Sequence, residues 1–324
     1  AGTKVTVRTG EEVYPDRGSV DFSSTGISVV PVQTDEYICA GKGVETWMPR
    51  FTYHGFRYAE MTFSDPSIVP SKEWLYAVPV HTDMAVRGNF TCSDPQINKL
   101  HQLCLRTVLG NIVGVPMDCP TREKCGWLGD SHAYIKMFCD NFDADNFITK
   151  YLGDICSGAD VRLENTLHHL LRNTEFYFTD KEAGIPFMIA PGKRLCGVAS
   201  PDWGTAVVQL PWHLYLYNGN RSALEEYYDS MKQWTDYICG IAVGNIVYQG
   251  LGDWDPPYGN NNMIPPIPFT SSAFHYYDVT IMAQAAAVLG KDEDTARYSA
   301  LKDEIKKAMV EKFYDPVVKT FGSQ

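Results

Sequence analysis

The first quarter of the chain alternates between apolar and polar positions, which is the pattern of half-buried β-strands. Residues 4–9 alternate, the run at 26–30 does so as well, and residues 56–63 alternate strictly. Gly, Pro and Asp residues separate these runs as turns. The pattern predicts a β-sandwich domain over residues 1–85.

The pattern changes to a helical period after Asn89. Ser93 is the predicted N-cap of a first helix, with Pro95 in its first turn and Gln96 at the capping-box position. Apolar residues then recur at helical spacing as far as Ile112. Asp130 is the predicted N-cap of the next helix.

Further helices are predicted downstream, which brings the total to about seven. Their predicted ranges are 146–156, 205–217, 223–241, 272–289 and 292–313. Gly290 followed by Asp292 joins a helix stop to a helix start, the signature of a helical hairpin. The second domain is therefore all-α and covers residues 86–324.

Composition narrows the partners. The net charge of −11 excludes nucleic acid and an anionic membrane surface, since both need clustered Lys and Arg. No apolar run approaches the length of a membrane span, and no signal peptide opens the chain. The start at Ala1 is typical of a cut or mature end, so cytoplasmic, periplasmic and secreted locations all stay open.

The nine cysteines are an odd number, and most lie in apolar, helix-like stretches. Buried free thiols are therefore expected. Cys119, Cys125 and His132 together suggest a zinc site. Their spacing lacks a CxxC pair, so neither a metal nor a cofactor is predicted.

Residues 118–130 carry the strongest chemical signal. Three carboxylates of this segment, Asp118, Glu123 and Asp130, lie beside Trp127. Glycoside hydrolysis needs one carboxylic acid to protonate the leaving oxygen and a second carboxylate that activates water or attacks carbon. An indole offers a flat platform for a sugar ring. The alternative is a charged surface loop that caps a helix.

This segment resembles the acidic signature of the α-L-rhamnosidases of glycoside hydrolase family 78. Residues 45–58 resemble that family too, as do Pro201-Asp202-Trp203-Gly204, Pro211-Trp212 and Gly252-Asp253-Trp254. The resemblance implies a β-sandwich followed by an all-α, (α/α)6-barrel-type helical domain. Twelve helices complete such a barrel, so about seven imply an incomplete barrel and a truncated chain.

The resemblance implies roles for individual residues. Glu123 matches the general acid, and Asp118 and Asp130 match residues that bind sugar hydroxyls. Arg122 and Lys124 flank Glu123 and would lower its pKa, so their side chains are expected to point elsewhere. The remaining candidates for substrate binding are Arg122, Trp127, Asp202, Trp203, Asp253 and Trp254.

We expect Trp127, Trp203 and Trp254 to share one pocket with the acidic segment. The family's general base lies on a later helix, and no matching motif occurs before Gln324. Asp202, Asp253 and Asp255 are the loop acids that could replace it.

The predicted function is inverting hydrolysis of terminal α-L-rhamnosyl residues from a rhamnose-containing glycoside or polysaccharide. Three alternatives remain open: a glycosidase for another terminal sugar, a non-catalytic carbohydrate-binding protein, and a purely structural helical module. The linkage, the aglycone and the oligomeric state are left open by the sequence.

Overall fold

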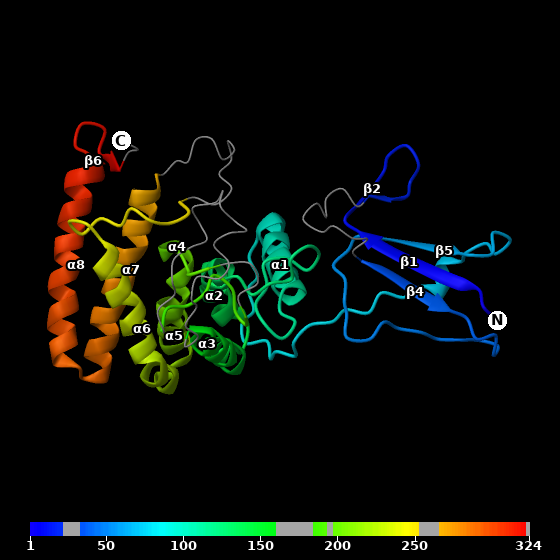
Figure 1. The fold of residues 1–324 in the computed structure, drawn as a ribbon, viewed down its shortest axis with the longest axis horizontal. Helices are drawn as coiled ribbons and strands as arrows, with labels where there is room; N and C mark the ends of the chain where they lie inside the picture. The colour runs from blue at the N-terminus through cyan, green and yellow to red at the C-terminus, as the bar shows by residue number, and fades with distance from the viewer. Residues whose placement is uncertain (22–32, 160–183, 193–196, 253–265, 322–324) are drawn as a thin grey trace. The chain divides into compact units, whose positions relative to one another are not determined.

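The computed structural model describes residues 1–21, 33–159, 184–192, 197–252 and 266–321 (Figure 1). They form two compact units. The first unit combines Ala1–Asp83 with Cys92–Cys125, and the second combines Met84–Thr91 with Gly126–Gln324. Strands and one long helix make up the first unit, whereas the second is mainly helical.

The first unit is built on a three-stranded antiparallel sheet. Its central strand is β1 (Lys4–Gly10), with β4 (Thr34–Ile38) on one side and β5 (Tyr58–Phe63) on the other. A separate ribbon pairs β2 (Glu12–Val13) with β3 (Val20–Asp21). The alternating runs at the start of the chain therefore form strands, as predicted, except for residues 26–30, which lie outside the described part.

Cross-strand pairs place apolar side chains on one face of the sheet. Val5 lies opposite Tyr37 on β4 and opposite Phe63 on β5. Tyr37 stacks on Trp47 at 5.5 Å between ring centroids, and Phe63 meets Trp74 edge-on at 6.0 Å. Within the described residues the unit contains this sheet and the ribbon, so only part of the predicted sandwich is defined.

Glu45 organises the turn that follows β4. Its carboxylate accepts hydrogen bonds from the amides of Ala40, Gly41 and Lys42 and from the hydroxyl of Tyr37, at 2.6–2.9 Å. These bonds, led by that from Lys42, lower the pKa of Glu45 to about 2. The carboxylate therefore acts as a local anchor in its ionised form.

We expect the turn to keep its order above the usual glutamate pKa and to lose it as the pH falls through about 2. The sign follows from a folded-state pKa that lies below the unfolded value. A side-chain carbon NMR titration of Glu45 measures the midpoint, and the three amides should shift with it. In Glu45→Gln these amide shifts should not follow pH. A midpoint at the ordinary glutamate value would contradict the anchor.

The first two long helices begin differently from the prediction. Helix α1 (Pro95–Gly110) is capped by Asp94, whose carboxylate accepts from the Gln96 amide at 2.8 Å, so the predicted Ser93 cap is wrong. Helix α2 (Leu128–Asn141) begins after Trp127, which places Asp130 inside the first turn. The predicted Asp130 cap is wrong because a distant backbone supplies the partner: the Leu128 amide donates to the Met188 carbonyl at 3.0 Å.

In the second unit, α5 contacts both α2 and α7. Helices α3 and α6 pack against α5, and α8 packs against α7. The bounds of the five further long helices are α3 (Asp145–Ala159), α5 (Ala206–Asn218), α6 (Arg221–Ile241), α7 (Ile267–Leu289) and α8 (Asp292–Phe313). The second unit also contains three short elements, α4 (Pro201–Gly204), β6 (Tyr314–Asp315) and β7 (Thr320–Phe321), and the first unit contains the short helix η2 (Lys72–Trp74).

Polar contacts show that α2 and α5 run in the same direction. At their starts, His132 Nε2 lies 2.8 Å from the carbonyl oxygen of Asp202, just before α5. At their ends, Arg87 donates its backbone amide to the Asn141 carbonyl and its guanidinium to Asn218. The N-termini of these helices therefore lie at the same end of the unit.

Helix α7 runs parallel to α5 by the same argument. Thr205, at the start of α5, bonds to Asp278 in the middle of α7, and Arg221, just after α5, donates to the Val288 carbonyl near the end of α7. Nine consecutive residues of α5, from Ala206 to Leu214, are buried. A helix that is apolar on all sides belongs between other helices, which explains its inner position.

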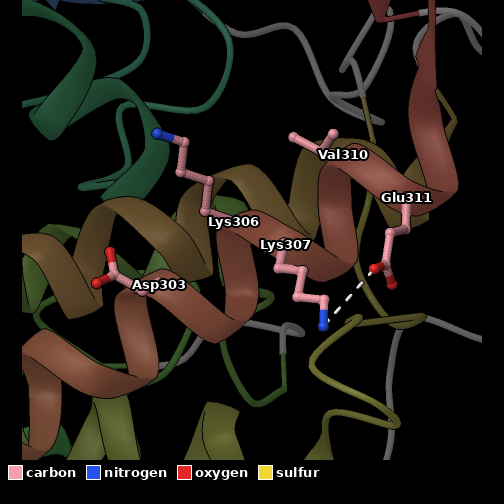
Figure 2. Close-up of a pocket in the computed structure, with 5 residues that line it drawn as sticks. All are labelled: Asp303, Lys306, Lys307, Val310 and Glu311. Atoms are coloured by element: carbon pink, nitrogen blue, oxygen red, sulfur yellow. Dashed lines mark ion pairs between the residues drawn. The ribbon is translucent and has the colours of Figure 1, made fainter.

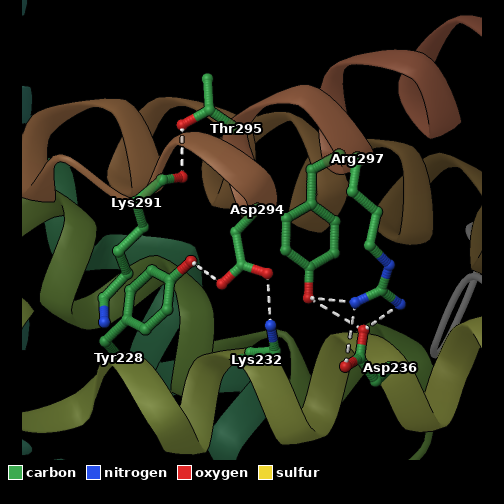
Figure 3. A network of polar contacts seen from close by, with 8 residues as sticks. Tyr228, Lys232, Asp236, Lys291, Asp294, Thr295 and Arg297 are labelled. Carbon is green, nitrogen blue, oxygen red and sulfur yellow. Dashed lines mark hydrogen bonds and ion pairs between the residues drawn. The ribbon is translucent and has the colours of Figure 1, made fainter.

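Helices α6 and α8 are cross-linked by a reciprocal polar network (Figure 3). Asp294 of α8 accepts from Tyr228, at 2.8 Å, and pairs with Lys232. Asp236 of α6 accepts from both the guanidinium of Arg297 and the hydroxyl of Tyr298 on α8. Each carboxylate thus receives two donors from the facing helix.

The predicted hairpin between α7 and α8 is confirmed. Gly290 ends α7 in the left-handed region, at φ 70°, and α8 spans the predicted range. Helix α7 begins at Ile267, five residues before the predicted start. Pro268 lies in the first turn of α7, where proline is tolerated because the first amides of a helix lack intrahelical partners.

The eight described cysteines are free thiols, as expected. Only Cys139 is buried, so the expectation of generally buried thiols is wrong: the other seven are partly exposed. Trp212 and Trp234 are buried core residues, as their helical patterns indicate. Among the described helices, none is long and apolar enough to span a membrane.

Candidate active-site loop and helical face

The segment with the predicted general acid is a closed loop in the first unit. At its base, the Asp118 amide donates to the Cys125 carbonyl at 3.1 Å. The Cys125 amide donates back to Asp118 Oδ1 at 3.0 Å. One oxygen of the Asp118 carboxylate therefore closes the loop, in addition to the sugar-binding role that the sequence predicts for this residue.

Two thiols hold the backbone of Glu123 inside the loop. The Glu123 amide donates to Cys119 Sγ at 3.3 Å, and Cys125 Sγ donates to the Glu123 carbonyl at 3.1 Å. Glu123 itself is partly exposed. Its backbone is thus fixed from both sides within the loop.

The tip of the loop is tied to residues 53–55 of the same unit. The Gly55 amide donates to the Pro120 carbonyl at 3.1 Å. A Cβ on Gly55 would lie 2.6 Å from Pro120 Cγ, so only glycine permits this approach. This contact gives residues 45–58, one of the motifs singled out from the sequence, a physical connection to the acidic loop.

Lys124 supplies a second tie between the acidic loop and Tyr53. Its ammonium donates to the Tyr53 carbonyl at 2.6 Å and lies 4.7 Å from the centre of the Tyr53 ring. Burial lowers the pKa of Lys124. The Tyr53 carbonyl and ring therefore engage the Lys124 ammonium, and its orientation relative to the Glu123 carboxylate stays a prediction.

Arg122 is exposed and forms no ion pair with another described residue.

Tyr53 donates its hydroxyl to Met117 Sδ, and burial, followed by the nearby Cys119 and Asp118, raises the pKa of Tyr53 to about 12. The phenol is therefore a neutral structural donor over the physiological range.

In the second unit, the predicted binding residues Asp202 and Trp203 lie against the start of α2. A Cβ on Gly129 would lie 2.6 Å from Cε2 of Trp203, so the indole rests directly on the Gly129 backbone. The Asp202 carbonyl contacts His132, as described above, and His132 also meets Phe274 edge-on at 5.5 Å. The turn that carries Asp202 and Trp203 is thereby packed beside the turn that carries Asp130.

Asp202 directs its carboxylate inward. The side chain is 3% exposed, and its Oδ2 accepts from the Leu251 amide at 3.1 Å. Burial raises the pKa of Asp202, and it lowers that of His132. In this arrangement the Asp202 carboxylate holds the segment that leads toward Asp253 and Trp254. Those two residues and Asp255 lie outside the described part of the chain.

The candidates thus fall into two groups. Asp118, Arg122 and Glu123 belong to the loop of the first unit, and Trp127, Asp130, Asp202 and Trp203 belong to the helical unit. Sharing of one pocket by the three tryptophans and the acidic segment stays a prediction.

Two buried polar residues of α7, His275 and Asp278, were not among the predicted site residues. His275 is 1% exposed, and neither ring nitrogen has a hydrogen-bond partner among the described residues. Asp278 is 1% exposed and is hydrogen-bonded to other helices. An acid at a buried position of an otherwise apolar helix is the signal that could have drawn attention to Asp278.

A surface pocket on α8 has no connection with these candidates. Its lining residues, Asp303, Lys306, Lys307, Val310 and Glu311, all come from α8 (Figure 2). Lys307 and Glu311 form an exposed ion pair at 3.9 Å. Within the part of the chain that the structure describes, no group of three or more His, Cys, Asp or Glu residues could hold a metal ion.

Comparison with known proteins gives consistent matches. Residues 85–321 match the bacterial α-L-rhamnosidase six-hairpin glycosidase domain, and residues 1–81 match the bacterial α-L-rhamnosidase concanavalin-like domain. An α-L-rhamnosidase of Formosa agariphila is 36% identical over 99% of this chain, and one of an Alteromonas species is 31% identical over 97%. The chain spans about a third of the length of these relatives, 33% and 32% respectively.

Solved structures agree with the sequence relatives. The α-L-rhamnosidase of Dictyoglumus thermophilum has a TM-score of 0.84 and 32% identity, with 98% of this chain and 33% of that chain covered. The Streptomyces avermitilis α-L-rhamnosidase, solved with L-rhamnose, has a TM-score of 0.82 and 29% identity, with 98% and 28% covered. The chain therefore belongs to the bacterial α-L-rhamnosidase family of six-hairpin glycosidases.

Proposed function

We propose that the full-length protein hydrolyses terminal α-L-rhamnosyl residues of a rhamnose-containing glycoside or polysaccharide. The observation that carries the proposal is the acidic loop, in which the Glu123 backbone is fixed and the neighbouring ammonium is held by Tyr53. A general acid must be held at a defined position near the glycosidic oxygen, so a fixed backbone favours this role. The names of the relatives support rhamnose as the sugar.

The proposed reaction is a single displacement with inversion. Glu123 gives its proton to the glycosidic oxygen, and the bond between this oxygen and the anomeric carbon breaks. A water molecule, deprotonated by a general base, attacks the anomeric carbon from the opposite face. We place this base outside the 324 residues, because no segment of the sequence resembles the motif that carries it in the family.

The remaining candidates are assigned to substrate binding. Asp118 and Asp130 accept hydrogen bonds from sugar hydroxyls, since ionised carboxylates are strong acceptors. Trp127, Trp203 and Trp254 offer indole faces to the apolar side of the deoxysugar. Arg122 and Asp253 extend this set. Asp202 contributes through the turn that it holds at Leu251.

The helical architecture suits this site. The three hairpins α2–α3, α5–α6 and α7–α8 bring three helix N-termini to one end of the unit, and we propose that they form half of an (α/α)6 barrel. We propose that the boundary between the β-sandwich domain and the helical domain lies between residues 85 and 86. Loops at the N-terminal ends of the inner helices would then carry the binding residues.

A stereochemical assay tests the proposal. We expect the full-length protein to hydrolyse p-nitrophenyl α-L-rhamnoside and to release β-L-rhamnose first, as seen by proton NMR before mutarotation. The 324-residue chain is expected to show no appreciable turnover, because the base lies elsewhere. First release of the α-anomer would contradict inversion. Binding of L-rhamnose without turnover by the full-length protein would indicate a carbohydrate-binding protein instead.

A further inference from the structure

Asp278 is a buried carboxyl group that the proposed reaction does not use. It lies in the middle of α7 and is 1% exposed. Its Oδ1 accepts from the Thr205 hydroxyl at 2.5 Å, and its Oδ2 accepts from the Trp234 indole N–H at 3.0 Å. Burial raises the pKa of Asp278 to about 7. A group that is so costly to bury implies a specific task.

Both donors connect Asp278 with the short helix α4: Thr205 is next to it in the chain, and Trp234 of α6 packs against it. Thr205 follows α4 directly, and its hydroxyl also accepts from Gln209 at 2.9 Å. Gly204, the last residue of α4, lies flat on the ring of Trp234: a Cβ there would be 2.2 Å from Cη2. Three helices, α5, α6 and α7, therefore contact α4 on the side of Gly204 and Thr205.

The predicted binding residues Asp202 and Trp203 lie on α4 and contact α2. Trp203 rests on Gly129, and the Asp202 carbonyl contacts His132 of α2. Asp130 lies between these two contact points on the first turn of α2. A shift of α4 would therefore change the position of Trp203 and Asp202 relative to Asp130.

We propose that Asp278 is a positioning residue for substrate binding. Through Thr205 and Trp234 it holds the helix Pro201–Gly204 at its position against the first turn of α2. Asp278 acts through α4 and touches neither the sugar nor the reacting atoms. The ligand in this inference, a terminal rhamnosyl group, rests on the proposed function. Loss of the network should weaken binding, with the proton transfer of Glu123 left intact.

Thr205 offers a matched pair of variants. Thr205→Val keeps the shape of the side chain and removes its hydroxyl, whereas Thr205→Ser keeps the hydroxyl. In the full-length protein we expect Thr205→Val to raise KM for p-nitrophenyl α-L-rhamnoside and the dissociation constant of L-rhamnose about tenfold, the change that corresponds to one lost hydrogen bond. The kcat should stay within about twofold. Thr205→Ser should behave like the parent, and Asp278→Asn should resemble Thr205→Val.

A remote variant separates positioning from general stability. Tyr298→Phe removes a hydroxyl that links α8 to Asp236 of α6 and has no hydrogen bond to α4 or Thr205 among the described residues. It should lower stability as Thr205→Val does without a change of KM. A KM that rises equally in Tyr298→Phe would overturn the proposal.

Hydrogen exchange gives a readout that is independent of the ligand. Amides of residues 201–205 and 128–132 should exchange faster in Thr205→Val, but not in Thr205→Ser or Tyr298→Phe. If the parent neither binds nor hydrolyses rhamnosides, the proposed function fails and exchange still decides whether Asp278 holds α4. Unchanged exchange in Thr205→Val, or faster exchange with an unchanged KM in an active protein, would overturn the inference.

Discussion

Replacement of Glu123 by glutamine is expected to lower hydrolysis of an unactivated rhamnosyl disaccharide by about 10²–10⁴-fold, the usual contribution of a general acid. This loss corresponds to about 3–5 kcal/mol of transition-state stabilisation. Glutamine keeps the size of the side chain, and the backbone contacts to Cys119 and Cys125 do not involve the carboxylate. The kcat of the full-length protein is the quantity to measure, with L-rhamnose affinity determined by calorimetry.

The leaving group supplies an internal control for this prediction. An activated aryl rhamnoside needs little protonation on departure, so its hydrolysis should decline less than that of the disaccharide. Glu73→Gln changes an exposed glutamate of η2 and should have no effect on either substrate. Disaccharide hydrolysis at the parental rate in Glu123→Gln would show that another group is the acid.

Replacement of Trp234 by alanine is expected to destabilise the helical unit by about 3–5 kcal/mol, the cost of removing a large aromatic side chain from a core. Trp234 is 0% exposed, and its ring supports Gly204. The substitution also removes the indole donor from Asp278, which adds the cost of an unsatisfied buried acceptor. Chemical denaturation followed by far-ultraviolet circular dichroism measures the change in the free energy of unfolding.

Two further variants divide this effect. Trp234→Phe retains most of the ring and removes the N–H, so its cost reports the hydrogen bond to Asp278 and a smaller loss of packing. Trp74→Ala, at a position that is 57% exposed, should cost no more than about 1 kcal/mol. A Trp234→Ala variant as stable as Trp74→Ala would mean that the indole is not part of the core that holds α4.

Local sequence signals predicted most of the helices because each depends on neighbours in the chain. Helix α8 spans the predicted range, since Gly290 permits the left-handed turn that ends α7 and apolar residues then repeat at helical spacing. The same holds for β1 and β5, where alternation reports a half-buried sheet. The motifs of residues 45–58 and 118–130 also indicate the family through their residue types and order alone.

Tertiary contacts decided what local signals could not. Asp130 does not cap α2, because the Met188 carbonyl, 60 residues along the chain, takes the Leu128 amide. Lys124 looked like a charge beside Glu123, yet the Tyr53 carbonyl, 71 residues away in sequence, receives its ammonium. Asp278 gains its role only when Thr205, 73 residues earlier, and Trp234, 44 residues earlier, reach it. The sequence by itself thus determined the family, the helices and the candidate acids, since these follow from residue type and short-range period. Which atom each polar side chain meets depends on long-range packing, and the folded structure alone decides that.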